Sequence, residues 1–143
     1  MTTATHGTER VLTAADAKLV LAAAEEKAVE TGVPVVIAVV DSAGALKALL
    51  AMDGVPPVAT EWAIDKAVTA ASFRAPTHVL AEGVAGDPAV LASVMARPHA
   101  TLAPAGFPIV ARGRVVGAVG ASGGTPDQDR VVAEAALEAL NGR

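Results

Sequence analysis

The sequence predicts an α+β protein in which an antiparallel sheet is flanked by helices. Two pairs of strands, each joined by a tight turn, predict hairpins at residues 34–52 and 107–122. Helical segments precede, separate and follow them, which gives the order α-β-β-α-α-α-β-β-α. Strands in hairpins are antiparallel and 143 residues suit a single domain, so this pattern disfavours a doubly wound parallel sheet.

The first helix has recognisable ends. Thr13 and Asp16 stand at the spacing of a capping box, with aspartate in place of the usual glutamate or glutamine. Gly32 and then Pro34 mark its C-terminal end. We expect residues 1–11 to form a flexible N-terminal tail.

The first hairpin follows directly. Its first strand, PVVIAVV, is a β-branched run, which indicates a central strand buried on both faces. In the turn DSAG, Asp41 can bind its own backbone and Gly44 can supply a positive φ. The segment ALKALLAM then returns as the second strand.

Three helices are predicted between the hairpins. The first is EWAIDKAVTAASFRAP, residues 61–76, and two short helices capped by Thr77 and Asp87 come after it. The segment RPHATLAPAG has two prolines and no periodicity, so it is predicted to be a loop. The second hairpin turns at Arg112–Gly113, and the closing helix begins with a capping box at Thr125 and Gln128.

The composition favours self-association. Apolar residues make up 52% of the chain but aromatic residues only 2%, so the core is built from alanine, valine and leucine. Each such residue buries little area, at about 25 cal/mol per Å². We therefore expect a homo-oligomer, in which subunit contacts add buried surface.

Charge and composition also exclude several classes of protein. The net charge is −4 with scattered lysines and arginines, and there are three aromatic residues, so nucleic acid binding is not expected. The longest apolar run is far shorter than the roughly 20 residues that a membrane span needs. The N-terminus lacks the apolar core of a signal peptide. The absence of cysteine excludes disulfides and thiolate chemistry. We expect a cytoplasmic protein with no membrane contact.

Lys66 occupies an unusual place on the central helix. At about 100° per residue, Trp62, Lys66, Thr69 and Phe73 fall within about 60° of one another. The lysine therefore lies between two rings and a face of small apolar residues. Asp65 points about 100° away and is a poor partner for it.

Two interpretations of Lys66 stay open. In one, the ammonium reaches solvent past the rings or pairs with a carboxylate from another element. In the other, it lines a pocket and binds an anionic ligand. A desolvated lysine also has a lowered pKa and could serve as an acid, a base or a Schiff-base amine.

The motif GASGG around Ser122 matches the nucleophile elbow G-x-S-x-G, but the order of residues is wrong. In that fold the histidine follows the serine, whereas His6, His78 and His99 all precede it. The segment SGGTPDQD instead predicts a turn and a helix cap. Its amides could cradle an anion, but two aspartates in the first helical turn would repel a phosphate.

Other polar residues give weaker signals. His78 and Glu82 have metal-ligand spacing, but two ligands do not make a site, so no metal site is predicted. Asp41, Asp53 and Asp65 could each supply a general base. For Asp41 and Asp53, ordinary turn chemistry is the competing interpretation.

Four segments, IDKAVTAASF, AMDG, AGFPI and GAVGASGGTPDQD, resemble the GlcG/HbpS-like family (DUF336), a haem-binding group related to the C-terminal domain of PduO. The likeness runs from about Leu12 to Leu140, and Lys66 is the family's hallmark. It implies a profilin-like fold, homo-oligomers and links to haem binding or degradation. Two departures stand out: Ala51 where an arginine is common, and Ala105 in place of a glycine.

Further residues are candidates for the site. His99 lies in the proline-rich loop and could be an axial haem ligand, with Met52 or Met95 as distant alternatives. An exposed loop histidine without such a role is the competing interpretation. The predicted ligand-binding residues are Lys66, Trp62, Met52, Gly106 and Phe107.

Two functions follow as alternatives. The first is a small-molecule-binding homo-oligomer that holds haem or a related tetrapyrrole, or a small anionic molecule. The second is a cofactor-free isomerase, lyase or hydrolase acting on a small organic acid. There Lys66 would bind the carboxylate or act as an acid, and Asp53, Asp65 or His99 would move protons. The scarcity of aromatic residues favours a small ligand, and a structural oligomer with no ligand is the third possibility.

Overall fold

The computed structural model describes residues 11–140, so the predicted N-terminal tail lies, except for Val11, outside the described residues. The elements follow in the predicted order. They are α1 (Ala14–Thr31), β1 (Val36–Asp41), β2 (Leu46–Ala51), α2 (Val58–Phe73), α3 (Thr77–Val84), α4 (Pro88–Met95), β3 (Gly106–Ala111), β4 (Arg114–Ser122), α5 (Pro126–Ala136) and a 3₁₀ turn (Leu137–Leu140).

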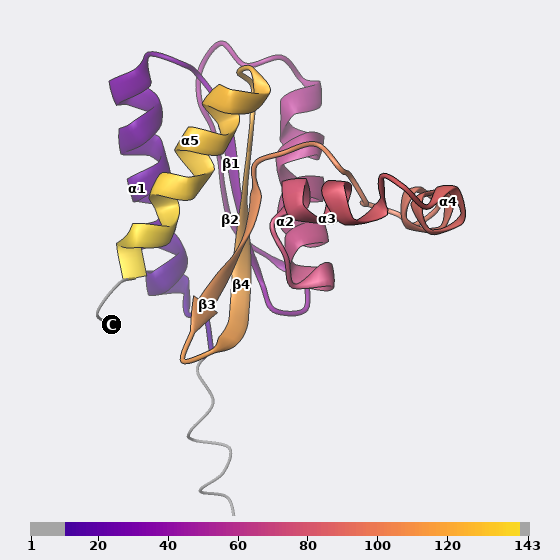
Figure 1. The fold of residues 1–143 in the computed structure, drawn as a ribbon. Helices are drawn as coiled ribbons and strands as arrows, with labels where there is room; N and C mark the ends of the chain where they lie inside the picture. The colour runs from indigo at the N-terminus through magenta and orange to yellow at the C-terminus, as the bar shows by residue number, and fades with distance from the viewer. Residues whose placement is uncertain (1–10, 141–143) are drawn as a thin grey trace, which may run out of the picture.

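The four strands form one antiparallel sheet with the order β2-β1-β4-β3. The two predicted hairpins are therefore confirmed, and they join through β1 and β4, which lie in the middle of the sheet (Figure 1). The side chains of Val36 to Val40 are fully buried, as the β-branched run predicts. The α+β class is confirmed.

Helices cover both faces of the sheet. The helices α1 and α5 lie side by side on one face, and α2 lies alone on the other (Figure 1). Two apolar clusters fill the layers. One joins α1 and α5 to the sheet through residues such as Val20, Ile37 and Val132, and the other is made largely of alanines from α2.

The predicted helix caps are confirmed at three helices. Thr13 and Asp16 bind each other's backbone N–H groups, and Gly32 ends α1 in the left-handed conformation. Asp87 accepts a hydrogen bond from the backbone of α4. The capping box at the start of α5 is also formed.

Both predicted turns are formed as well. The Asp41 carboxylate accepts hydrogen bonds from the backbone N–H groups of Ala43 and Ala45, and Gly44 has a φ of 85°. Arg112 and Gly113 both have positive φ, which matches the twist of a two-residue hairpin turn.

The prediction that Thr77 caps α3 is wrong. Pro76 holds the cap position, and Thr77 is the first residue of the helix. Its hydroxyl accepts a hydrogen bond of 3.0 Å from the backbone N–H of Gly106, at the start of β3. The side chain therefore ties α3 to the sheet.

Two glycines bring α2 into direct contact with the sheet. Gly106 on β3 and Gly120 on β4 are cross-strand partners beneath the helix. A methyl group at Gly120 would overlap the backbone oxygen of Ala63, and one at Gly106 would overlap that of Lys66. This close approach explains why the inner face of α2 is made of alanine, and it fixes the height of Lys66 above β4.

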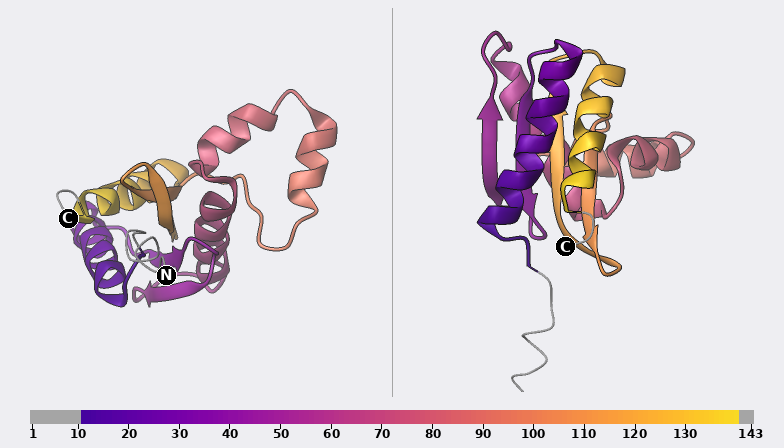
Figure 2. Two further views of the ribbon diagram at one scale, coloured as in Figure 1. Left: turned by 90° about the horizontal axis from the view of Figure 1, so that it is seen from below. Right: turned by 90° about the vertical axis from the view of Figure 1, so that its left-hand side faces the viewer.

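The helices α3 and α4 form an arm that projects away from the body of the protein (Figure 2). In α4, Val94 is the buried residue, while Val90 and Met95 are exposed. Among the described residues, no helix is long and apolar enough to cross a membrane.

Candidate functional site

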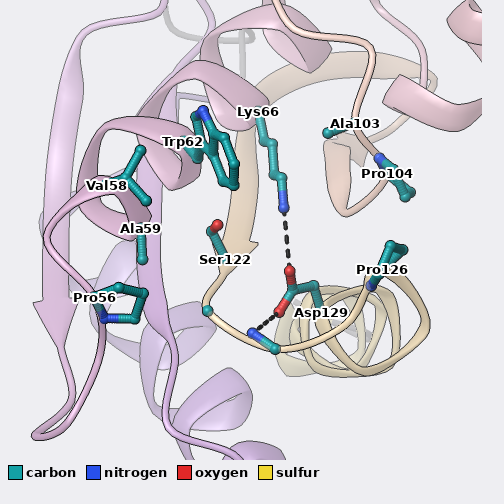
Figure 3. A pocket seen from close by; sticks show the side chains of 12 residues that line it. Pro56, Val58, Ala59, Trp62, Lys66, Ala103, Pro104, Ser122, Pro126 and Asp129 are labelled. Atoms are coloured by element: carbon teal, nitrogen blue, oxygen red, sulfur yellow. Dashed lines mark hydrogen bonds and ion pairs between the residues drawn. The ribbon is translucent and has the colours of Figure 1, made fainter.

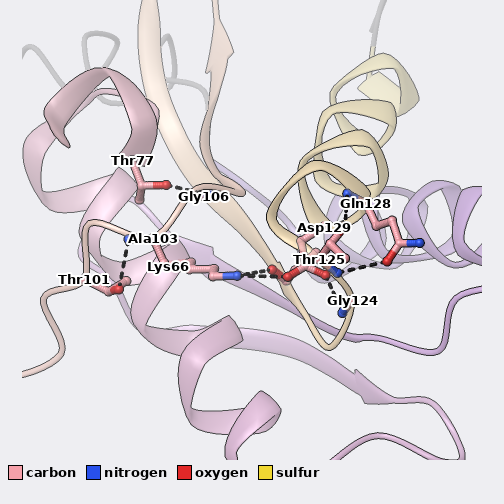
Figure 4. Close-up of polar contacts among 10 residues, drawn as sticks. Lys66, Thr77, Thr101, Ala103, Gly106, Gly124, Thr125, Gln128 and Asp129 are labelled. Atoms are coloured by element: carbon pink, nitrogen blue, oxygen red, sulfur yellow. Dashed lines mark hydrogen bonds and ion pairs between the residues drawn. The ribbon is translucent and has the colours of Figure 1, made fainter. Parts of the chain in front are cut away.

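Lys66 is buried beneath α2 and forms an ion pair across the layers. Its side chain is 4% exposed, and Nζ donates to the carbonyl oxygen of Ala121 at 2.8 Å and to Oδ2 of Asp129 at 3.3 Å (Figure 4). This partner, Asp129, belongs to α5, the helix that follows β4 in the chain. This confirms the first interpretation of Lys66 in one respect: it pairs with a carboxylate from another element.

Asp129 is held from two directions. Its Oδ1 accepts a hydrogen bond of 2.8 Å from the backbone N–H of Gly124, and its residue is 4% exposed. It stands in the first turn of α5, where the helix dipole favours negative charge. The capping box of Thr125 and Gln128 begins the helix and so aims this carboxylate at the lysine (Figure 4).

The ion pair borders a pocket of about 300 Å³. Figure 3 shows its wall, with Trp62 and Lys66 on one side and Asp129 opposite. The pocket is lined by Pro56, Val58, Ala59, Trp62, Lys66, Ala103, Pro104, Ser122, Gly123, Gly124, Pro126 and Asp129. Because most of these side chains are apolar, the charged pair is the main polar feature of the site.

The ammonium group has one hydrogen-bond donor left for a ligand. An ammonium carries three donors, and two bind Ala121 and Asp129. The third has no partner in the part of the chain that the structure describes. A ligand oxygen can therefore bind Lys66 if it approaches from the side away from Asp129, where repulsion between like charges is weakest.

Burial lowers the pKa of Lys66 below the usual 10.5, and the charge and hydrogen bond of Asp129 oppose this shift in part. In the window between the folded and unfolded pKa values, the unfolded chain holds more protons. The free energy of unfolding therefore rises with pH across this window.

A comparison of the wild-type protein with Lys66→Met checks this pH dependence. We expect the stability difference in favour of the wild type to grow as the pH rises from neutral toward 10.5, the usual pKa of lysine, because only the wild type has the perturbed lysine. Urea denaturation at several pH values measures it. A difference that stays constant or shrinks would show that the pKa is not lowered.

His99 lies in the loop before β3 and contacts α2, not the pocket. Its Nδ1 is 3.1 Å from Oδ1 of Asp65, and its side chain is 67% exposed. The hydroxyl of Thr69 donates to the His99 carbonyl and accepts from the Thr101 N–H, so the loop is fastened to α2. The structure thus joins two predicted catalytic residues, His99 and Asp65, into a pair separate from Lys66.

Met52 and Asp53 lie elsewhere. They line a shallow hollow of about 330 Å³ together with Glu25, Leu50 and Ala51, at the end of β2. The structure does not bring them to Lys66, because β2 is the edge strand beside β1 and the pocket lies at the end of β4.

Gly106 and Phe107 also lie outside the pocket. Gly106 is covered by α2 at its close approach to the sheet. Phe107 packs in the core with the α1–α5 layer, and its ring centroid is 5.7 Å from that of His78. Both positions serve packing in this structure. Of the five predicted ligand-binding residues, Lys66 and Trp62 line the pocket.

His78 and Glu82 both lie on α3. Within residues 11–140, no group of three or more histidine, cysteine, aspartate or glutamate residues could hold a metal ion. The Nδ1 atom of His78 is buried without a hydrogen-bond partner.

Sequence reasoning missed Asp129 as the partner of Lys66. It assigned the aspartates of the SGGTPDQD segment to the helix terminus alone. Two signals in the sequence could have found it. A lysine predicted to lie on an apolar helix face needs a carboxylate partner, and the closing helix has aspartates in its first turn directly after a strand. Ser122 and the two following glycines were treated as a turn, and they also form part of the pocket wall.

Comparisons with known proteins place the chain in a family. Residues 12–138 match the model of the family described as haem degrading protein HbpS-like, and the chain belongs to this family. It is 35% identical over 131 residues to an uncharacterized 15.0 kDa protein in the dhaT-dhaS intergenic region of Citrobacter freundii, covering 91% of this chain and 92% of that protein.

Solved structures agree with this assignment. The fold matches Klebsiella pneumoniae protein ORFY with a TM-score of 0.86 and 30% identity, covering 95% of this chain and 96% of that one. It also matches PduOC in a complex with haem, with a TM-score of 0.85 and 29% identity, covering 92% of this chain and 96% of that one.

Proposed function

We propose that this protein is a homo-oligomer that binds haem or a related tetrapyrrole. The observation that supports it best is the match to the haem complex of PduOC over 92% of the chain. Membership of the HbpS-like family points in the same direction.

The pocket beside Lys66 suits a tetrapyrrole of which only one edge enters the pocket. A pocket of about 300 Å³ is at the small end of ligand sites and cannot enclose a macrocycle. The free donor of Lys66 suits a carboxylate on such an edge. Trp62, which is 52% exposed, offers a flat apolar surface to the part that stays outside. When bound, haem supplies a redox-active iron.

Exposed apolar side chains support the oligomer. Val79 on α3 and Val90 and Met95 on α4 are between 44% and 50% exposed, on an arm that stands away from the body (Figure 2). A contact with a second subunit would remove this apolar surface from water.

Native mass spectrometry of the freshly purified protein, before and after addition of haemin, tests both parts of the proposal. We expect a mass of several subunits that gains haem-sized increments. A matched Trp62→Ala variant should keep the subunit number and gain haem less completely, because the exposed ring is lost. A monomer would contradict the oligomer, and an assembly that never gains haem would contradict the ligand.

The size of the pocket favours a second candidate function, an enzyme acting on a small organic acid. A site of about 300 Å³ fits such a molecule entirely, with its carboxylate on Lys66 and Asp129 as the nearest proton-transfer group. The same mass spectra distinguish the two functions. This candidate predicts an increment from an added small carboxylic acid and none from haemin.

A further inference from the structure

His99 and Asp65 form a polar pair that the Lys66 pocket does not use. Oδ1 of Asp65 lies 3.1 Å from Nδ1 of His99. A carboxylate accepts hydrogen bonds, so Nδ1 carries the proton in the neutral ring and Nε2 holds a free lone pair. Within the described chain, Nε2 has no hydrogen-bond partner, and the ring is largely exposed.

The backbone around His99 is held in place for this arrangement. His99 has a φ of 62°, which is uncommon for a residue with a side chain. The hydroxyl of Thr69 donates to its carbonyl oxygen at 3.1 Å and accepts from the N–H of Thr101 at 3.0 Å. Because Thr69 is buried, these two bonds fix the loop and thereby the imidazole over α2.

Two exposed aromatic residues, Trp62 and Phe73, belong to the same helix as Asp65 and Thr69. Trp62 precedes Asp65 by three residues, about one helical turn, and Phe73 follows Thr69 by four, while Thr69 itself is buried beneath the loop that carries His99. Trp62 is 52% exposed and Phe73 is 36% exposed. Because Trp62 also lines the Lys66 pocket, a flat ligand whose edge enters that pocket can extend over this ring toward the Asp65–His99 pair.

We infer that Nε2 of His99 is an iron ligand for the bound tetrapyrrole and that Asp65 is its positioning residue. This inference rests on the proposed function and adds the ligating atom. A histidine that ligates a metal commonly donates its other ring N–H to a carboxylate, which fixes the tautomer and raises the basicity of the ligand. The Asp65–His99 pair has this arrangement before any ligand is present.

Spectroscopy of the haemin-reconstituted full chain tests the inference. We expect His99→Ala to change the Soret band and the electron paramagnetic resonance of the ferric state, and added imidazole to restore both. Asp65→Asn should keep a histidine-ligated spectrum but bind haem about tenfold more weakly and show a higher reduction potential. The control His78→Ala should keep the wild-type spectrum, because that ring lies against Phe107.

The outcomes separate this inference from the proposed function. If the wild-type chain takes up no haem, both are overturned. If it binds haem and His99→Ala leaves the spectra unchanged, only the ligand assignment is overturned. If His99→Ala changes the spectra but Asp65→Asn matches the wild type in affinity and potential, the positioning role of Asp65 is overturned.

Discussion

Replacement of Lys66 with methionine is expected to lower the free energy of unfolding by about 3–5 kcal/mol. The side chain is nearly fully buried, and so is that of its partner Asp129. Without Lys66, the Asp129 carboxylate is a buried charge with no opposite charge beside it. The free-energy cost of taking this carboxylate out of water is then no longer offset by the ion pair. Chemical denaturation at neutral pH, fitted with a common slope, measures the loss.

Two controls make this result specific to the buried pair. In the double variant Lys66→Met/Asp129→Asn both charges are gone, and the amide oxygen of the asparagine can still accept the N–H of Gly124. We expect it to be more stable than the single variant, by about 1 kcal/mol or more. Lys27→Met breaks an exposed pair with Glu30 and should cost less than about 1 kcal/mol. A Lys66→Met variant as stable as Lys27→Met would contradict the account of this site.

Substitution of Gly120 with alanine should destabilise the protein by about 3 kcal/mol or more. The added methyl group would overlap the backbone oxygen of Ala63 and lie within 2.8 Å of the backbone nitrogen of Ala67. Backbone atoms cannot turn aside as a flexible side chain can, so α2 would have to lift from β4. Such a shift would also move Lys66 away from Asp129.

Gly83→Ala is the matched control for this effect. A methyl group at Gly83 meets nothing within 4 Å, and the residue lies in α3. Because alanine has the higher helix propensity, we expect this change to be neutral or slightly stabilising. Thermal unfolding of both variants tests the comparison. Equal melting temperatures would show that the contact between α2 and the sheet tolerates an extra methyl group.

Local signals made the elements of the fold predictable from the sequence. Capping residues such as Thr13 and Thr125 and turn residues such as Asp41 and Gly113 act within a few positions of the chain, so their patterns are visible there. The prediction failed at Thr77, because its hydroxyl binds Gly106, a partner 29 residues away. Neither pattern nor propensity contains such a long-range contact.

The same distinction applies to the candidate site. Helical periodicity placed Lys66 and Trp62 together on α2, and both line the pocket. Asp129 lies 63 residues beyond Lys66 in the chain. The two residues come into contact because the two hairpins pair through β1 and β4. Met52 was predicted as a possible haem ligand and Asp53 as a possible general base, and the edge position of β2 keeps both apart from the pocket.

The central claim is that the pocket beside Lys66 and Asp129 binds the ligand. Haemin titration of the wild-type protein and of Lys66→Met/Asp129→Asn, followed by absorbance of the Soret band, tests it most directly. We predict that the double variant keeps its fold, checked by circular dichroism, and binds haemin at least about tenfold more weakly, since an ion-pair contact is worth more than about 1.4 kcal/mol. A folded double variant that binds haemin as tightly as the wild type would contradict the claim.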